Sequence, residues 1–146
     1  MKFNLTIDPT KTEEVRVTAH QRSSLTDQIE NLVLQYAGKD RLPAYTEDGM
    51  KMLLFEDIEC ITVTEGKTFA IDTQNKKYRL KHRLYELEKV LPGCFIRINK
   101  STLANEKRLD RFSAAFNGAV NAVFKCGYTE YVSRRCFAEI KRRYDE

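Results

Sequence analysis

Three short segments in the second half of the sequence place a cation beside side chains that form hydrogen bonds. They are Lys67-Thr68, Asn99-Lys100-Ser101-Thr102 and Ser133-Arg134-Arg135. An arginine can hold a guanine edge with two hydrogen bonds, and an asparagine can do the same for adenine. Serine, threonine and lysine are ordinary phosphate ligands, which fix position without specifying sequence. The chemistry that these segments could perform is therefore recognition of a nucleic acid.

The basic charge of the chain is concentrated in its second part. Residues 1–65 contain 7 lysines and arginines against 12 acidic residues, whereas residues 66–146 contain 18 against 9. A basic half of this kind favours a polyanionic partner such as nucleic acid or an acidic membrane surface. Charge alone leaves a competing hypothesis open, a non-enzymatic β-rich interaction module whose basic face binds an acidic protein or a membrane surface.

The sequence contains none of the common catalytic or metal-binding patterns. Its two histidines, His20 and His82, lie apart from any serine or cysteine motif, and glycine-rich phosphate loops are absent. The four cysteines have no C-x-x-C spacing and predict buried free thiols: Cys60, Cys94, Cys126 and Cys136. We therefore expect a protein that is not an enzyme and that needs no cofactor, metal or small-molecule substrate.

The elements that must position the three segments follow from the spacing of apolar residues. Residues 3–7 and 15–19 alternate apolar and polar side chains, which predicts two short strands. Residues 23–36 carry an apolar helical stripe from Leu25 to Tyr36, with Ser23 or Ser24 as N-cap and Gly38 as the stop. The prediction is a small strand-strand-helix unit over residues 1–45, too small to bury a core alone.

From about residue 44 the pattern changes to short strands separated by turns. Strands are predicted at 51–55, 58–63, 69–73 and 78–81 as an antiparallel meander, followed by a short helix that Pro92-Gly93 stops. A strand at 95–98 comes next, then a hairpin at Asn117-Gly118, a last strand and a terminal helix capped by Ser133. The predicted fold class is α+β, mainly β, with residues 46–146 forming the second domain.

The stretches around the three segments resemble the LytTR DNA-binding domain of bacterial transcription regulators. The most specific motifs are F-I-R-I-x-K-S-x-L-x-N at residues 95–105 and V-S-R-R at residues 132–135. The resemblance covers about residues 46–146. It implies an antiparallel β domain with short helices that inserts loops into the major groove of double-stranded DNA, and hence a sequence-specific transcription regulator. We expect it in the cytoplasm, because the sequence shows neither an apolar run of transmembrane length nor the apolar region of a secretory signal.

The resemblance also implies site residues. The family's base-contacting positions fall on Lys67 or Thr68, on Asn99 and Lys100, and on Arg135. Positions for phosphate contact or support are Arg97, Ser101, Arg134 and Lys107. Ser133 is better explained as a helix N-cap and Asn105 as a structural turn residue, whereas Arg97 and Ser101 fit a structural role equally well.

The first 45 residues are too short for the receiver domain of the family's well-known members. The resemblance implies dimers on paired DNA sites, and in some small members control by a membrane-protein inhibitor. Three roles for the apolar stripe from Leu25 to Tyr36 stay open: packing against the β domain, a homodimer surface, or a docking site for such an inhibitor.

Overall fold

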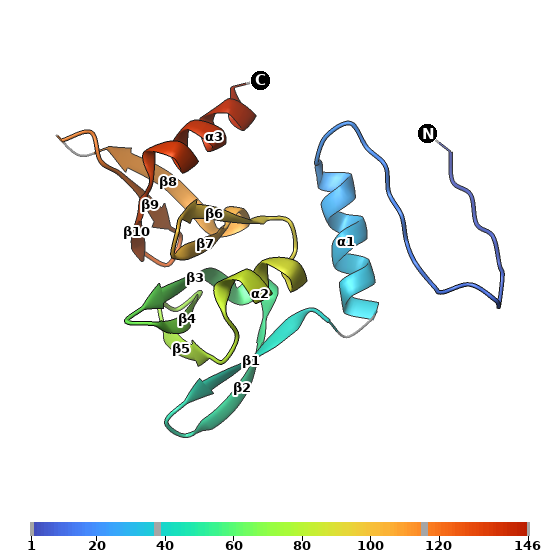
Figure 1. Ribbon diagram of the computed structural model, residues 1–146, viewed down its shortest axis with the longest axis horizontal. Helices are drawn as coiled ribbons and strands as arrows, with labels where there is room; N and C mark the ends of the chain where they lie inside the picture. The colour runs from blue at the N-terminus through green and yellow to red at the C-terminus, as the bar shows by residue number, and fades with distance from the viewer. Residues whose placement is uncertain (1, 37–38, 115–116, 146) are drawn as a thin grey trace.

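The computed structural model describes residues 2–36, 39–114 and 117–145. Short antiparallel strands make up most of the chain, and three helices surround them (Figure 1). The helices are α1 (Ser24–Tyr36), α2 (Leu84–Val90) and α3 (Arg134–Tyr144). The first five strands are β1 (Arg41–Thr46), β2 (Gly49–Leu54), β3 (Ile58–Thr64), β4 (Lys67–Asp72) and β5 (Lys77–Leu80). The others are β6 (Phe95–Asn99), β7 (Thr102–Asn105), β8 (Leu109–Ala114), β9 (Val120–Phe124) and β10 (Thr129–Val132).

The strands form two antiparallel sheets, as a mainly β fold of the α+β class requires. Seven strands are ordered β2-β1-β5-β4-β3-β7-β6, and three are ordered β10-β9-β8. Strands β3, β4 and β5 form the predicted meander, whereas β2 pairs with β1 and not with β3. The sequence missed β1 because Pro43 interrupts its pattern. The large sheet therefore begins at Arg41, inside the predicted unit of residues 1–45.

The two strands predicted at residues 3–7 and 15–19 are not formed in the single chain. Residues 2–23 contain neither helix nor strand, and the chain runs extended beside α1 (Figure 1). An alternating pattern supplies the side chains of a strand, but a strand also needs a neighbour for its backbone groups. The predicted helix is confirmed as α1, and its proposed stop at Gly38 lies outside the described residues.

Strand β3 separates two apolar cores, because its side chains alternate between the faces of the sheet. Ile61 faces the core beneath α2, and Cys60 faces the core beneath α3. The first core includes Leu42, Phe55, Tyr78, Leu80, Leu84 and Leu87. The second includes Ile71, Ile98, Ala122, Phe124, Val132 and Ile140. This second core packs α3 and β10 against β6, and so fixes where the terminal helix begins.

The four cysteines are free, as expected, and three of them are buried. Burial raises the pKa of the Cys60 thiol well above its ordinary value, because an apolar environment disfavours the thiolate. A protonated, buried thiol is a poor nucleophile, so Cys60 serves the packing of the core.

One carboxylate, Glu59, is fully buried at the boundary between the two sheets. Its Oε2 accepts a hydrogen bond from Arg108 Nε at 2.5 Å, and its Oε1 accepts one from the backbone N–H of Cys126 at 2.7 Å. A buried charge of this kind is tolerated only when its oxygens are paired. The ion pair therefore ties the turn before β8 and the turn after β9 to strand β3.

We expect Arg108→Ala to lower the free energy of unfolding by about 3 kcal/mol, because Glu59 would keep a buried charge without its cation. Arg111→Ala is the matched control, since Arg111 pairs with the exposed Asp110, and should cost less than about 1 kcal/mol. Urea unfolding of both variants measures the difference. Equal losses would contradict the role assigned to the buried pair.

Candidate nucleic-acid interface

The structure brings the three cationic segments to neighbouring positions. We call residues 64–68 the first loop, residues 99–102 the second loop and residues 133–135 the third loop. The first loop joins β3 to β4, the second joins β6 to β7, and the third leads from β10 into α3. Because Thr62 of β3 lies opposite Thr102 of β7, the first and second loops leave the large sheet at the same end.

The second loop is held to the end of β3, just before the first loop, by two contacts. The backbone N–H of Val63 donates to the carbonyl of Ser101 at 2.9 Å. The hydroxyls of Thr62 and Thr102 share a buried hydrogen bond of 3.1 Å. The β3-β4 hairpin and the β6-β7 hairpin are thus joined up to the point where their loops begin.

The second loop is held to the third by the side chain of Asn99, which is only 1% exposed. Its Nδ2 donates to the carbonyl of Tyr131 at 2.7 Å, and its Oδ1 accepts from the N–H of Ser101 at 2.7 Å. The N–H of Ser133 donates to the carbonyl of Ile98 at 2.8 Å. Asn99 therefore shapes its own loop and at the same time fixes the end of β10 beside it.

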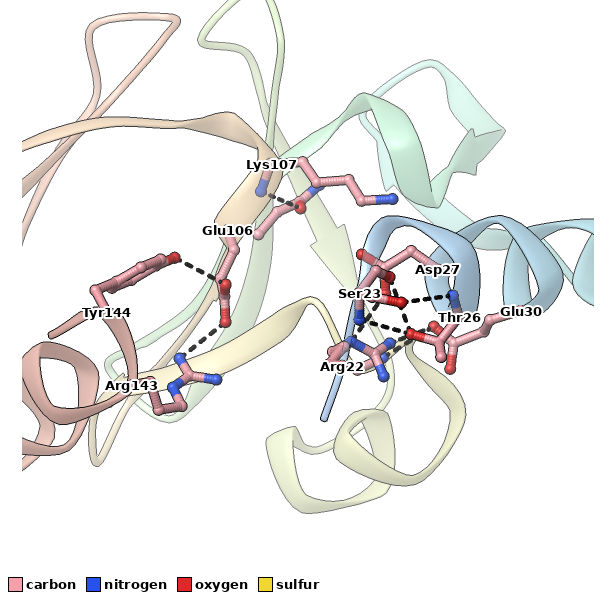
Figure 2. Close-up of polar contacts among 11 residues, drawn as sticks. Arg22, Ser23, Thr26, Asp27, Glu30, Glu106, Lys107, Arg143 and Tyr144 are labelled. Atoms are coloured by element: carbon pink, nitrogen blue, oxygen red, sulfur yellow. Dashed lines mark hydrogen bonds and ion pairs between the residues drawn. The ribbon is translucent and has the colours of Figure 1, made fainter. Parts of the chain in front are cut away.

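Helix α3 is fixed at both ends, which determines where the third loop points. Ser133 Oγ accepts from the N–H of Cys136 at 3.2 Å, so the predicted N-cap is confirmed. At the other end Glu106 accepts hydrogen bonds from Arg143 at 2.8 Å and from the Tyr144 hydroxyl at 3.0 Å (Figure 2). The helix begins at the third loop, where its backbone N–H groups favour an anion.

A tight turn shapes the first loop. Glu65 and Gly66 have φ values of 53° and 75°, the left-handed conformation of a two-residue hairpin turn. Lys67 follows at the surface, whereas Thr68 is 6% exposed and lies opposite Val63 and Leu80. Of the two alternatives that the sequence left in this loop, Lys67 is the one that faces solvent.

The predicted site residues fall into two groups. The exposed cations are Lys67, Lys100, Arg134 and Arg135. In the described part of the chain their side chains form no ion pair or hydrogen bond, so each is available to a ligand. Asn99 and Thr68 are buried, and Ser101 is half-buried.

Arg97 belongs to the support of the second loop. Its Nη1 donates to the carbonyl of Lys100 at 2.6 Å, and its Nε pairs with Glu88 of α2. The sequence predicted support as one of two roles for Arg97, but it gave no sign of the partner Glu88. The buried role of Asn99 was also missed, although an asparagine two residues before Ser101 is the pattern of an Asx turn.

The described residues offer no other obvious chemistry at this surface. They hold no cluster of three or more histidine, cysteine, aspartate or glutamate residues that could bind a metal. Across the same residues, every helix is too short or too polar to cross a membrane. The arrangement supports binding of an anion through cations presented on rigid loops.

The comparison with known families decides the identity of this fold. The model of the LytTr DNA-binding domain matches residues 48–145. The chain belongs to the LytTR family. This membership places it among DNA-binding transcription regulators, which are not enzymes, and confirms the resemblance of the sequence motifs.

Solved and curated relatives agree with this assignment. A solved structure of the LytTr DNA-binding domain of a putative methyl-accepting/DNA response regulator from Bacillus cereus superposes with a TM-score of 0.66 at 18% identity. The match covers 73% of this chain and 98% of that chain. Uncharacterized HTH-type transcriptional regulators of Staphylococcus aureus, strains bovine RF122 / ET3-1 and NCTC 8325 / PS 47, are each 33% identical over 98% of this chain and 97% of their own. The similarity to both Staphylococcus aureus regulators extends over the N-terminal segment as well as the LytTR domain.

The LytTR domain differs from a helix-turn-helix in a way that bears on DNA contact. Among the described residues, strands β1 to β5 separate α1 from α2, and strands β6 to β10 separate α2 from α3. No two of these helices follow one another across a short turn, as a recognition helix would require. A recognition helix of the helix-turn-helix type is therefore not formed by the described residues.

We expect Asn99→Ala to lower the free energy of unfolding by about 2 to 4 kcal/mol, because the Tyr131 carbonyl and the Ser101 N–H would lose their partner. Asn121→Ala, at a half-buried position on β9, is the control and should cost about 1 kcal/mol or less. In NMR spectra, Asn99→Ala should also shift the amides of the second and third loops together. Shifts confined to the second loop would argue against the coupling.

Proposed function

We propose that this LytTR protein regulates transcription by binding specific sites in double-stranded DNA, with its three loops in the major groove. The observation that carries the proposal is the set of four exposed cations on loops that buried hydrogen bonds join to one another: Lys67, Lys100, Arg134 and Arg135. Rigid loops lower the entropy lost on binding, because their side chains start from a fixed backbone.

The four cations differ in what they can contribute. Arg135 has the forked guanidinium that matches the O6 and N7 atoms of guanine, so it is the strongest candidate for a base contact. Lys100 and Lys67 stand at hairpin tips, from which a lysine reaches either a base edge or a phosphate. Arg134 and Ser101 are candidates for phosphate contact. Lys107 is exposed, but it follows β7 at the end of that strand opposite to the second loop, so it does not lie with the other cations.

The remaining predicted residues act in this proposal by positioning the contacts. Asn99 and Arg97 hold the second loop from two sides, one through Tyr131 and the other through Glu88. Thr68 fills space beneath the first loop. A buried side chain of this kind affects DNA binding through the geometry of its loop.

The biological setting of the proposal follows from its ligand. A regulator that binds operator DNA in a bacterium works in the cytoplasm, and the family resemblance favours dimers on paired sites. Control by a membrane-protein inhibitor is compatible with the exposed apolar residues of the N-terminal segment.

We expect Arg135→Ala to weaken binding to a selected duplex by about 1 to 3 kcal/mol and to relax specificity at one base pair. Lys100→Ala should weaken binding and, if the contact is to a phosphate, reduce the slope of log K against log salt by about 1. Lys76→Ala is the matched control, because it removes one exposed positive charge at the opposite end of β4 from Lys67.

The operator is best obtained by selecting bound duplexes from a random pool with the unaltered protein and then with each variant. Fluorescence anisotropy at several salt concentrations then gives the affinities. Binding by the Arg135 and Lys100 variants equal to that of Lys76→Ala would contradict the proposed contacts. Equal affinity for all competitor duplexes would contradict sequence specificity.

A further inference from the structure

The N-terminal segment, residues 2–8, presents the side chains of a strand without a neighbouring strand. Its apolar residues are exposed: Phe3 to 87%, Leu5 to 72% and Ile7 to 82%. The one backbone hydrogen bond within residues 2–20 closes a turn, from the N–H of Lys11 to the carbonyl of Asp8 at 3.2 Å. Extended backbone with free N–H and C=O groups is a template for pairing with another strand.

The segment is complementary to a second copy of itself. If two copies pair antiparallel with Leu5 opposite Leu5, then Phe3 lies opposite Ile7 and Lys2 lies opposite Asp8. Residues directly opposite in an antiparallel pair share a face, so this register places all the apolar side chains on one face. It also creates two pairs of opposite charge, one at each end of the paired segment. A pairing in which residue i meets residue j, and j meets i, is the form that a two-fold symmetric interface takes.

Helix α1 adds further exposed apolar surface to the N-terminal region. None of its residues is buried, and its largest exposed apolar residues are Leu25, Leu32 and Tyr36. A groove of about 470 Å³ lies between α1 and the extended chain, with Val15, Val17, Ala19, Ile29 and Val33 among its lining residues. The single chain thus leaves a second apolar surface open, between α1 and the segment that follows residues 2–8.

Polar contacts fix the first turns of α1, and one of them reaches the β domain. Arg22 Nε lies 2.9 Å from Asp27 Oδ1 and its Nη2 lies 2.7 Å from Glu30 Oε1 (Figure 2). Glu30 also accepts from the N–H of Gly93 at 3.3 Å. The contact with Gly93 holds the start of α1 beside the β domain, and Leu25, Leu32 and Tyr36 stay exposed.

The charge of this region permits two copies to approach. Residues 2–36 contain four lysines and arginines against five acidic residues, whereas the remainder of the chain carries the basic excess. Contact through residues 2–36 therefore avoids the repulsion that two basic halves would experience.

We propose that residues 2–8 pair antiparallel with residues 2–8 of a second copy, centred on Leu5. The partner is a second copy of this chain, because the charges and apolar residues match in one self-complementary register. The inference deepens the proposed function, because a symmetric dimer would present two DNA interfaces to paired sites. Only this use of the dimer rests on the proposed function; the pairing itself does not.

The register is tested by disulfide formation in the full chain without DNA. Leu5→Cys should give a cross-linked dimer on mild oxidation, because directly opposite residues lie within the Cα separation of a disulfide, about 4.4 to 6.8 Å. Ile7→Cys is the control on the same face, because each Ile7 would lie opposite Phe3 and far from the other Ile7. The unaltered protein reports the background from its four cysteines. We expect at least fivefold more dimer from Leu5→Cys than from either control on a non-reducing gel.

Sedimentation equilibrium provides a second measurement. Lys2→Asp should raise the dimer dissociation constant about three- to tenfold, because it places like charges opposite each other at both ends of the pair. Lys11→Asp makes the same change in charge outside the paired segment and should have a smaller effect.

The inference is overturned if the unaltered protein sediments as a monomer and Leu5→Cys cross-links no more than Ile7→Cys. A monomer that still binds its operator would leave the DNA interface standing and assign the N-terminal surface to another protein. A protein that sediments as a dimer but binds no DNA would support the N-terminal pairing and contradict the DNA interface. The two proposals can therefore fail separately.

Discussion

A single buried amide, that of Asn99, joins the second loop to β10, the strand that leads into the third loop, and the geometry of the candidate interface depends on it. The amide must be satisfied inside the protein, because a buried donor or acceptor without a partner costs about 1 to 3 kcal/mol. One arrangement of the neighbouring backbone meets this need, with Ser101 N–H on the oxygen and the Tyr131 carbonyl on the nitrogen. The hydrogen-bonding requirement of one side chain thus constrains two chain segments that are 32 residues apart.

A second asparagine uses the same pattern elsewhere in the fold. Asn105 accepts from the N–H of Lys107 at 3.1 Å and donates to the carbonyl of Ile58 at 2.9 Å. In both cases the oxygen forms a local turn with the residue two positions later, and the nitrogen holds a distant strand. Buried polar residues therefore fix the ends of the hairpins, and the exposed cations at the second and third loops remain free to bind.

The N-terminal segment shows the opposite situation, in which a local pattern has no partner within the chain. Alternation of Phe3, Leu5 and Ile7 correctly identifies side chains suited to a strand, but pairing is a property of two segments. Residues 2–8 and 12–20 do not pair with each other, and α1 buries none of its own residues. The apolar surface left over is a feature of this region that the LytTR domain alone does not explain.

The sequence by itself determined the mainly β class, most of the elements and the identity of the family. Periodicity was sufficient for β3 to β6, for α2 and for α3, because those segments bury one face and end at strong turn or capping signals. Motif spacing was sufficient to locate the three loops and their cations.

Only the tertiary structure decided which polar residues face the solvent. Lys100 and Asn99 are neighbours in the sequence, and both suit contact with a base. Lys100 is exposed, whereas Asn99 is buried, with 1% of its surface exposed. The difference arises because Asn99 is bonded to β10, and a contact with a residue 32 positions away leaves no local pattern in the sequence. Burial depends on the packing of distant segments, whereas the chemistry of a side chain is fixed by its type.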